Sequence, residues 1–261
     1  MPRTLATNRQ CNLSHTKCFN FDGNTAKADF GATTFFDSTL PFAFELRCDL
    51  GKYYNSTTTG VQGLLSFKTD QGVPWIVDYG KSATVIVVAG ASSIFARIRP
   101  TTPSSLANII NRGWHDMIII FDGVDRTAVG SFTMYVDGVG VPLTAAGAIG
   151  ATTHLNTLGI LGGTFAGVSS CGVFRTWNGG SAMTAQQVAD LAFRGIKPTG
   201  PTLTHEYLFT EGAGTTLADT AGSATGTITT GGGSWSTTTG PFAARTIAPT
   251  RTIAGARTLV S

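Results

Sequence analysis

The fold is decided by the stretch Phe42-Ala-Phe-Glu-Leu-Arg-Cys-Asp49. Every second side chain is apolar, so positions 42, 44, 46 and 48 share one face of an extended chain, while Glu45, Arg47 and Asp49 share the other. A period of two is typical of a β-strand with one buried face. We therefore expect a strand over 42–49 whose apolar face packs on a core and whose polar face is solvated.

Two stretches further along the chain extend this pattern. Trp114–Phe121 is a largely apolar run, which predicts a strand that lies between two layers. Ser131–Asp137 alternates again, and the dipeptide Asp137-Gly138 predicts a turn into a returning strand over 139–143. Further short strands are expected at 61–68, 74–79, 84–89, 94–98, 155–161, 165–177 and 203–210.

One short helix is expected near residue 190. Thr184 is a candidate N-cap, and Gln187 three residues later completes a capping box. Val188 and Leu191 belong to an apolar stripe at helical spacing, and Gly195 is a typical helix end.

The composition favours β structure and argues against nucleic-acid and membrane partners. Charged residues make up 13% of the 261 residues, against about 25% in an average protein, and 33 residues are glycine. The formal net charge is +3, and no dense basic face of the kind that binds nucleic acid is present. No apolar run is long enough for a transmembrane helix, and residues 1–14 lack the apolar centre of a secretory signal. A glycine- and threonine-rich β protein is typical of one that works outside a cell, yet this chain has no secretory signal. A virion, which is made in the host cytoplasm and then leaves the cell, reconciles the two observations.

Several motifs, taken in order, resemble one family of β domains. They are Phe19-Asn-Phe-Asp-Gly23, Trp114-His115, Met134-Tyr-Val-Asp-Gly138 and the stretch Tyr207–Asp219. Their order is similar to that in concanavalin A-like and laminin G-like (LamG) jelly-roll domains, a kind found in phage virion proteins. The resemblance covers about residues 19–236 and implies an all-β, two-sheet antiparallel jelly-roll sandwich with one short helix.

The Tyr207–Asp219 motif normally opens such a domain, but here it follows the predicted helix. Either a second, truncated unit begins there, or the last strands over 203–236 fold back onto the same sandwich. We prefer the fold-back, because so short a unit buries too little surface to be stable alone. The expected organisation is an N-terminal arm at 1–18, a domain at 19–240 and a C-terminal arm at 241–261.

No catalytic residue is expected. Jelly-roll glycosidases need two carboxylates about 5–10 Å apart, and the E-x-D-x-x-E string of the resembling hydrolases is absent. The nearest fragment, Glu45 with Asp49, is better explained as a solvated strand face. None of the four histidines lies in a metal-binding or metalloprotease motif.

Binding sites have only weak candidates in the sequence. No cofactor is expected, although Asp22, Asn24 and Asp29 are calcium candidates, with turn formation as the equal alternative. Candidate sugar-binding residues are Trp75, Trp177 and Asn178, where an aromatic ring would stack on a sugar. Cys48 and Cys171 are expected as buried free thiols, whereas a Cys11–Cys18 disulfide stays open.

These features predict a non-enzymatic bacteriophage virion protein: a capsid decoration, head-fibre or tail-associated jelly roll. Its arms, with Arg245, Arg251 and Arg257 in the C-terminal one, are expected to bind neighbouring subunits. Those neighbours would be other virion proteins, such as the major capsid protein, or further copies in a homo-oligomer. The alternative is a carbohydrate-binding, lectin-like module for host surface glycans.

Overall fold

Strand β3 (Phe42–Asp49) lies in the middle of the first of two antiparallel sheets, between β8 (Trp114–Phe121) and β15 (Val168–Asn178). For the strands between 61 and 100 and for the described residues from 145 to 169, the structure describes the backbone alone. The computed structural model describes residues 17–22, 25–37, 39–49, 61–68, 74–80, 84–91, 94–100, 114–125, 128–145, 157–158, 160–161, 165–166 and 168–237.

Five more strands belong to the first sheet: β1 (Cys18–Asp22), β9 (Phe132–Val136), β10 (Val139–Val141), β16 (Leu203–Tyr207) and β19 (Ser234–Ser236). The strand order is β10-β9-β8-β3-β15-β1-β19, with β16 beside β15. β15 has two partners along one side, because its first half pairs with β1 and its second half with β16.

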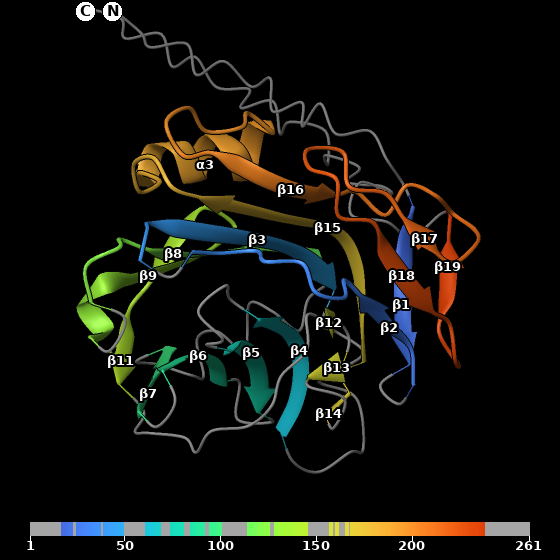
Figure 1. The fold of residues 1–261 in the computed structure, drawn as a ribbon. Helices are drawn as coiled ribbons and strands as arrows, with labels where there is room; N and C mark the ends of the chain where they lie inside the picture. The colour runs from blue at the N-terminus through green and yellow to red at the C-terminus, as the bar shows by residue number, and fades with distance from the viewer. Residues whose placement is uncertain are drawn as a thin grey trace, which may run out of the picture.

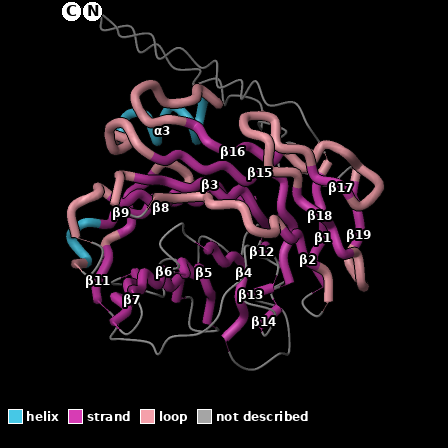
Figure 2. Tube along the Cα trace, in the orientation of Figure 1, coloured by secondary structure: helices cyan, strands magenta, loops and turns pink. Residues whose placement is uncertain are grey.

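The second sheet contains β2 (Lys27–Asp29), β4 (Val61–Lys68), β5 (Pro74–Gly80), β6 (Thr84–Ala91), β7 (Ile94–Pro100), β11 (Leu143–Ala145), β12 (Thr157–Leu158), β17 (Thr216–Leu217) and β18 (Gly226–Thr229). The strand order is β11-β7-β6-β5-β4-β12-β2-β18-β17. β13 (Ile160–Leu161) and β14 (Phe165–Ala166) pair separately. The two sheets form the layers of a sandwich (Figure 1), and strands dominate the described chain (Figure 2). The predicted all-β, two-sheet antiparallel architecture is confirmed.

The core between the sheets is rich in phenylalanine. The apolar face of β3 is fully buried there, as its alternation predicted, with Phe44 and Leu46 at 0% exposure. The Phe30 ring lies 4.7 Å from that of Tyr207 and 5.5 Å from that of Phe174, measured between ring centroids. Each large apolar side chain buried in this way contributes about 1.5–3 kcal/mol.

The α-helix of the described residues, α3 (Ala185–Arg194), covers the outer face of the first sheet (Figure 1). It begins at Thr184, whose side-chain oxygen accepts the Gln187 backbone N–H, while the Gln187 side chain accepts the Thr184 N–H. It ends at Gly195, which has a left-handed φ of 66° that glycine adopts at little cost. The predicted helix, its capping box and its end are confirmed.

The helix turns β8 into a strand that is buried on both sides. Met117 and Ile119 point into the core between the sheets, whereas Ile118 and Ile120 belong to a second apolar cluster on the outer face. This cluster contains the buried helix residues Val188 and Leu191 together with Ala43, Trp177 and Met183. The prediction that 114–121 lies between two layers is confirmed.

The last strands of the described chain complete both sheets. β16 pairs with β15, β18 with β2, and β19 with β1, all antiparallel. Residues 203–236 therefore join the sheets that the earlier strands form. In the described part of the chain, no helix has the length and hydropathy needed to cross a bilayer.

Candidate functional site

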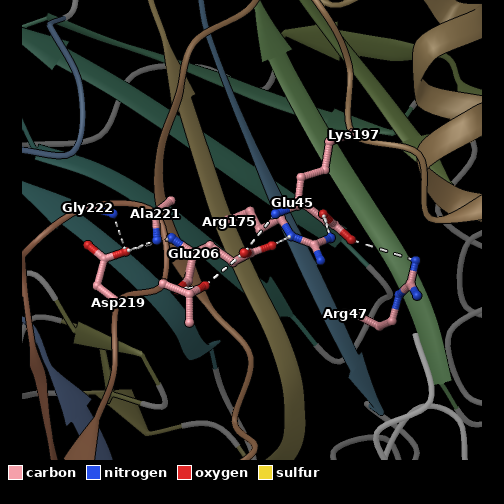
Figure 3. A network of polar contacts seen from close by, with 9 residues as sticks. Glu45, Arg47, Arg175, Lys197, Glu206, Asp219, Ala221 and Gly222 are labelled. Atoms are coloured by element: carbon pink, nitrogen blue, oxygen red, sulfur yellow. Dashed lines mark hydrogen bonds and ion pairs between the residues drawn. The ribbon is translucent and has the colours of Figure 1, made fainter. Parts of the chain in front are cut away.

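Five charged side chains are buried together on the outer face of the first sheet: Glu45, Arg47, Asp116, Arg175 and Glu206. We call these five the polar network, and each is at most 5% exposed. Figure 3 shows four of them, Glu45, Arg47, Arg175 and Glu206. Across the strands, Arg175 lies opposite both Glu45 and Glu206, and Arg47 lies opposite Asp116. Acidic and basic side chains therefore face one another across the four adjacent strands β8, β3, β15 and β16.

Arg175 is the centre of the polar network. Its Nε donates to Glu206 Oε1 at 2.6 Å, and its Nη1 donates to Glu45 Oε2 at 2.7 Å. Arg47 Nη2 donates to Asp116 Oδ2 at 2.8 Å and lies 3.7 Å from Glu45 Oε1. Removal of one member leaves a buried charge without its partner, so the network ties the four strands together.

The expectation that Glu45 lies on a solvated face was wrong, because Glu45 is 0% exposed. The alternation placed it correctly on the outer face, but this face is covered, and an arginine lies directly opposite on β15. Asp49, at the end of the same strand, stays partly exposed. A signal was present in the composition, since two of only three glutamates in the chain, Glu45 and Glu206, belong to the network.

Glu206 links the polar network to the surface. Its Oε2 accepts from Lys197 Nζ and from Thr220 Oγ1, both at 2.8 Å. Burial alone would raise the pKa of Glu206, but hydrogen bonds from Lys197, Arg175 and Thr220 outweigh burial and lower it. Burial also disfavours the charge on Arg175, yet Glu45 and Glu206 together raise its pKa.

Asp116 has the most perturbed carboxyl group of the polar network. Burial, followed by the negative charge of Glu45, raises the pKa of Asp116 to about 7, although Arg47 acts in the opposite direction. One oxygen of each carboxyl, Glu45 Oε1 and Asp116 Oδ1, is buried without a hydrogen-bond partner. Because a buried unpaired polar atom is costly, this arrangement favours a protonated carboxyl.

Two histidine–aspartate pairs fix the acids of the polar network in place. Asp137 Oδ2 lies 2.8 Å from His115 Nδ1, and Asp137 Oδ1 accepts the backbone N–H of Asp116 at 3.0 Å. Asp219 repeats this arrangement with His205, at 2.7 and 3.0 Å. The residues that follow the two histidines are the network acids Asp116 and Glu206. Asp137 and Asp219 therefore bind the backbone at the two positions that carry a buried carboxyl group.

Such a pair is also part of a hydrolase triad, which needs a nucleophile on the other histidine nitrogen. The residue opposite His115 on β3 is Cys48. Burial raises the pKa of the Cys48 thiol well above its usual range, so it stays a neutral thiol and a poor nucleophile. His115 Nε2 is buried and makes no hydrogen bond. The arrangement therefore orients a strand and does not activate Cys48.

The calcium candidates are held by protein donors. Asp22 accepts three backbone N–H groups at 2.9–3.0 Å, one of them from Gly232 on the loop before β19. Asp29 binds Lys27 Nζ at 2.9 Å. Asn24 lies outside the described residues. Within the described ranges, no three His, Cys, Asp or Glu side chains gather as metal ligands.

The sugar-binding candidates do not form a common site. Trp177 is 1% exposed beneath α3, so its assignment as a stacking platform was wrong, because no ring face is open. The Asn178 side chain accepts the Asp37 N–H at 2.7 Å and donates to the Asp37 carbonyl at 3.1 Å, which fixes a loop. The side chain of Trp75 lies outside the described residues.

The cysteine predictions are partly tested. Cys48 and Cys171 are buried free thiols, as expected. Cys18 is also buried, and a bridge to Cys11 stays an open prediction. Cys11 itself and the partner-binding candidates Arg245, Arg251 and Arg257 lie outside the described residues.

No protein-family model matches the chain, and no curated protein matches it.

Proposed function

We propose that this chain is a non-enzymatic structural protein of a virion, a laminin G-like sandwich that joins neighbouring subunits through its two terminal segments. One observation carries the proposal. β1 and β19 are paired so that Cys18 lies opposite Ser236. Lys17 and Thr237, where the described chain begins and ends, therefore adjoin neighbouring strands of the first sheet, with β19 at its edge and β1 next to it.

The charge distribution supports a binding role for the C-terminal segment. Residues 238–261 contain three arginines and no acidic residue. The rest of the chain then has 15 Lys and Arg against 15 Asp and Glu, so this segment carries the whole formal net charge of +3. A basic segment suits an acidic surface on a neighbouring subunit.

The three arginines also belong to a short repeat. Arg-Thr-Ile at 245–247 and at 251–253 is followed by Arg-Thr-Leu at 257–259. In an extended chain, six residues span about 20 Å and return side chains to the same side. Each repeat would then offer one guanidinium and one aliphatic side chain to an equivalent site on a repeating partner.

The polar network and α3 support a scaffold role for the sandwich. The charges of the network form ion pairs between four strands. The histidine–aspartate pairs bind the backbone N–H groups of Asp116 and Glu206. Trp177 and Asn178 are likewise engaged inside the protein. These described side chains serve the fold and are not available to a partner.

The test compares two full-length variants of equal charge by light scattering coupled to size exclusion. The tail variant carries Arg245→Gln, Arg251→Gln and Arg257→Gln, and the control carries Lys17→Gln, Lys27→Gln and Arg194→Gln. We expect the natural chain and the control to form an oligomer, or to be incorporated into particles, and the tail variant to lose this property. A natural chain that stays a monomer and never joins particles would refute the proposal. Binding on a glycan array would favour the lectin alternative instead.

A further inference from the structure

The polar network contains a pair of carboxyl groups that lacks a hydrogen-bond donor. Glu45 and Asp116 lie on neighbouring strands and both use Arg47, at 3.7 Å and 2.8 Å. Arg175 occupies the second oxygen of Glu45, and Arg47 occupies one oxygen of Asp116. The two remaining oxygens, Glu45 Oε1 and Asp116 Oδ1, are buried and make no hydrogen bond.

A single proton on one of the two carboxyl groups would provide the missing hydrogen-bond donor. Two buried carboxylates beside one guanidinium repel each other, whereas a protonated carboxyl can donate to its neighbour. After burial, the negative charge of Glu45 is the largest influence that raises the pKa of Asp116. We call Glu45 and Asp116 the carboxyl pair.

We propose that the carboxyl pair holds one proton between its members and that loss of this proton loosens the cover of the outer face, so that the sandwich contains a proton-controlled latch. The cover consists of α3 and residues 195–202. The other charged and titratable groups on the elements around the pair are Arg47 and Asp49 on β3, His115 on β8, Asp137 after β9, Arg175 on β15, Glu206 on β16, and Asp190, Arg194 and Lys197 on the cover.

The cover is the part able to respond. β3 and β8 are held by a continuous ladder of eight cross-strand pairs, and β3 is also paired with β15 along its whole length. The segment 195–202 has an ion pair to the network, from Lys197, whose side chain is 47% exposed. Ile118, which lies opposite Glu45 on β8, belongs to the same apolar cluster as Val188 and Leu191 of α3, so opening of the cover would admit water to the ionised pair without breaking the sheet.

The direction of the effect follows from linkage. An aspartate has a pKa near 4 in the unfolded chain, whereas that of Asp116 is about 7 in the fold. Between these values the folded state binds more protons than the unfolded state, so stability falls as the pH rises. Above about pH 7 the proton has left both states and the loss is complete.

The test uses the full chain and two measurements. Hydrogen exchange reports protection factors for α3 at about pH 5 and about pH 8, corrected for the intrinsic exchange rate. We expect at least a tenfold lower protection at the higher pH in the natural chain. Glu45→Gln and Asp116→Asn each supply a permanent donor between the two side chains, and both should remove this pH dependence. Asp29→Asn, a carboxyl-to-amide change on the second sheet, should leave it unchanged.

The second measurement needs no variant to fold. Infrared difference spectra of the natural chain between about pH 5 and about pH 8 should show the loss of a carboxylic-acid C=O band that titrates near pH 7. Absence of such a band, or equal protection of α3 at both pH values, would overturn the proposal. The same pH dependence in Glu45→Gln as in the natural chain would also overturn it.

Discussion

Replacement of Arg175 by methionine removes the central cation of the polar network and keeps a long side chain in its place. Two hydrogen bonds are lost, at 2.6 and 2.7 Å, and Glu206 and Glu45 stay behind at 4% and 0% exposure. Loss of one partner from a buried ion pair costs about 3–5 kcal/mol. Since a domain is stable by about 5–15 kcal/mol in total, Arg175→Met should remove a large share of the stability.

Denaturant unfolding, followed by far-ultraviolet circular dichroism and by tryptophan fluorescence, measures this loss and checks that the transition is two-state. Arg194→Met is the matched control, because Arg194 is 62% exposed in an i,i+4 pair that is worth about 0.5 kcal/mol or less. Addition of Glu45→Gln and Glu206→Gln to Arg175→Met should restore much of the loss by removing the stranded charges. A loss below about 1 kcal/mol in Arg175→Met would refute the claim that the network ties the strands together.

Three further outcomes follow from the fold. Thr184→Ala removes the helix N-cap and should lower the free energy of unfolding by about 1 kcal/mol in denaturant. The control Gln186→Ala, on the exposed side of α3, should change it little. Equal effects of the two variants would show that the cap is not stabilising. Phe44→Ala opens a cavity in the core between the sheets and should cost about 3–5 kcal/mol, with the exposed Thr133→Ala as the control, and a cost near zero would contradict the packing. The pKa values of Glu206 and Asp219 are lowered in the fold, so their contribution is complete above about pH 4–5 and is lost as the pH falls further; thermal melts below about pH 4 should show this loss, and Asp219→Asn should flatten it.

The sequence allowed the elements to be predicted well, because the relevant signals are local. The alternation in 42–49 places Phe44 and Leu46 on a buried face, and the capping residues Thr184 and Gln187 define the start of the helix. These signals depend on backbone geometry and on neighbours within a few residues, so they can be read without knowing the fold.

The candidate site could not be predicted, because it depends on which strands become neighbours. Glu45 has the pattern of a solvent-facing residue until Arg175, far along the chain, is placed opposite it on β15. Trp177 was misjudged for the same reason, since only the packing of α3 onto β15 shows that its ring is covered. A polar residue on a strand is exposed or buried according to what covers that face of the sheet, which is a property of the whole fold.

Electron microscopy of the native assembly tests the proposed scaffold role most directly. It should show this sandwich among neighbouring subunits, with contacts made by the segments that continue from β1 and β19 and with the polar network closed beneath α3. A particle without this chain, or a chain whose partner or ligand sits on the opened polar network while both terminal segments touch nothing, would contradict it.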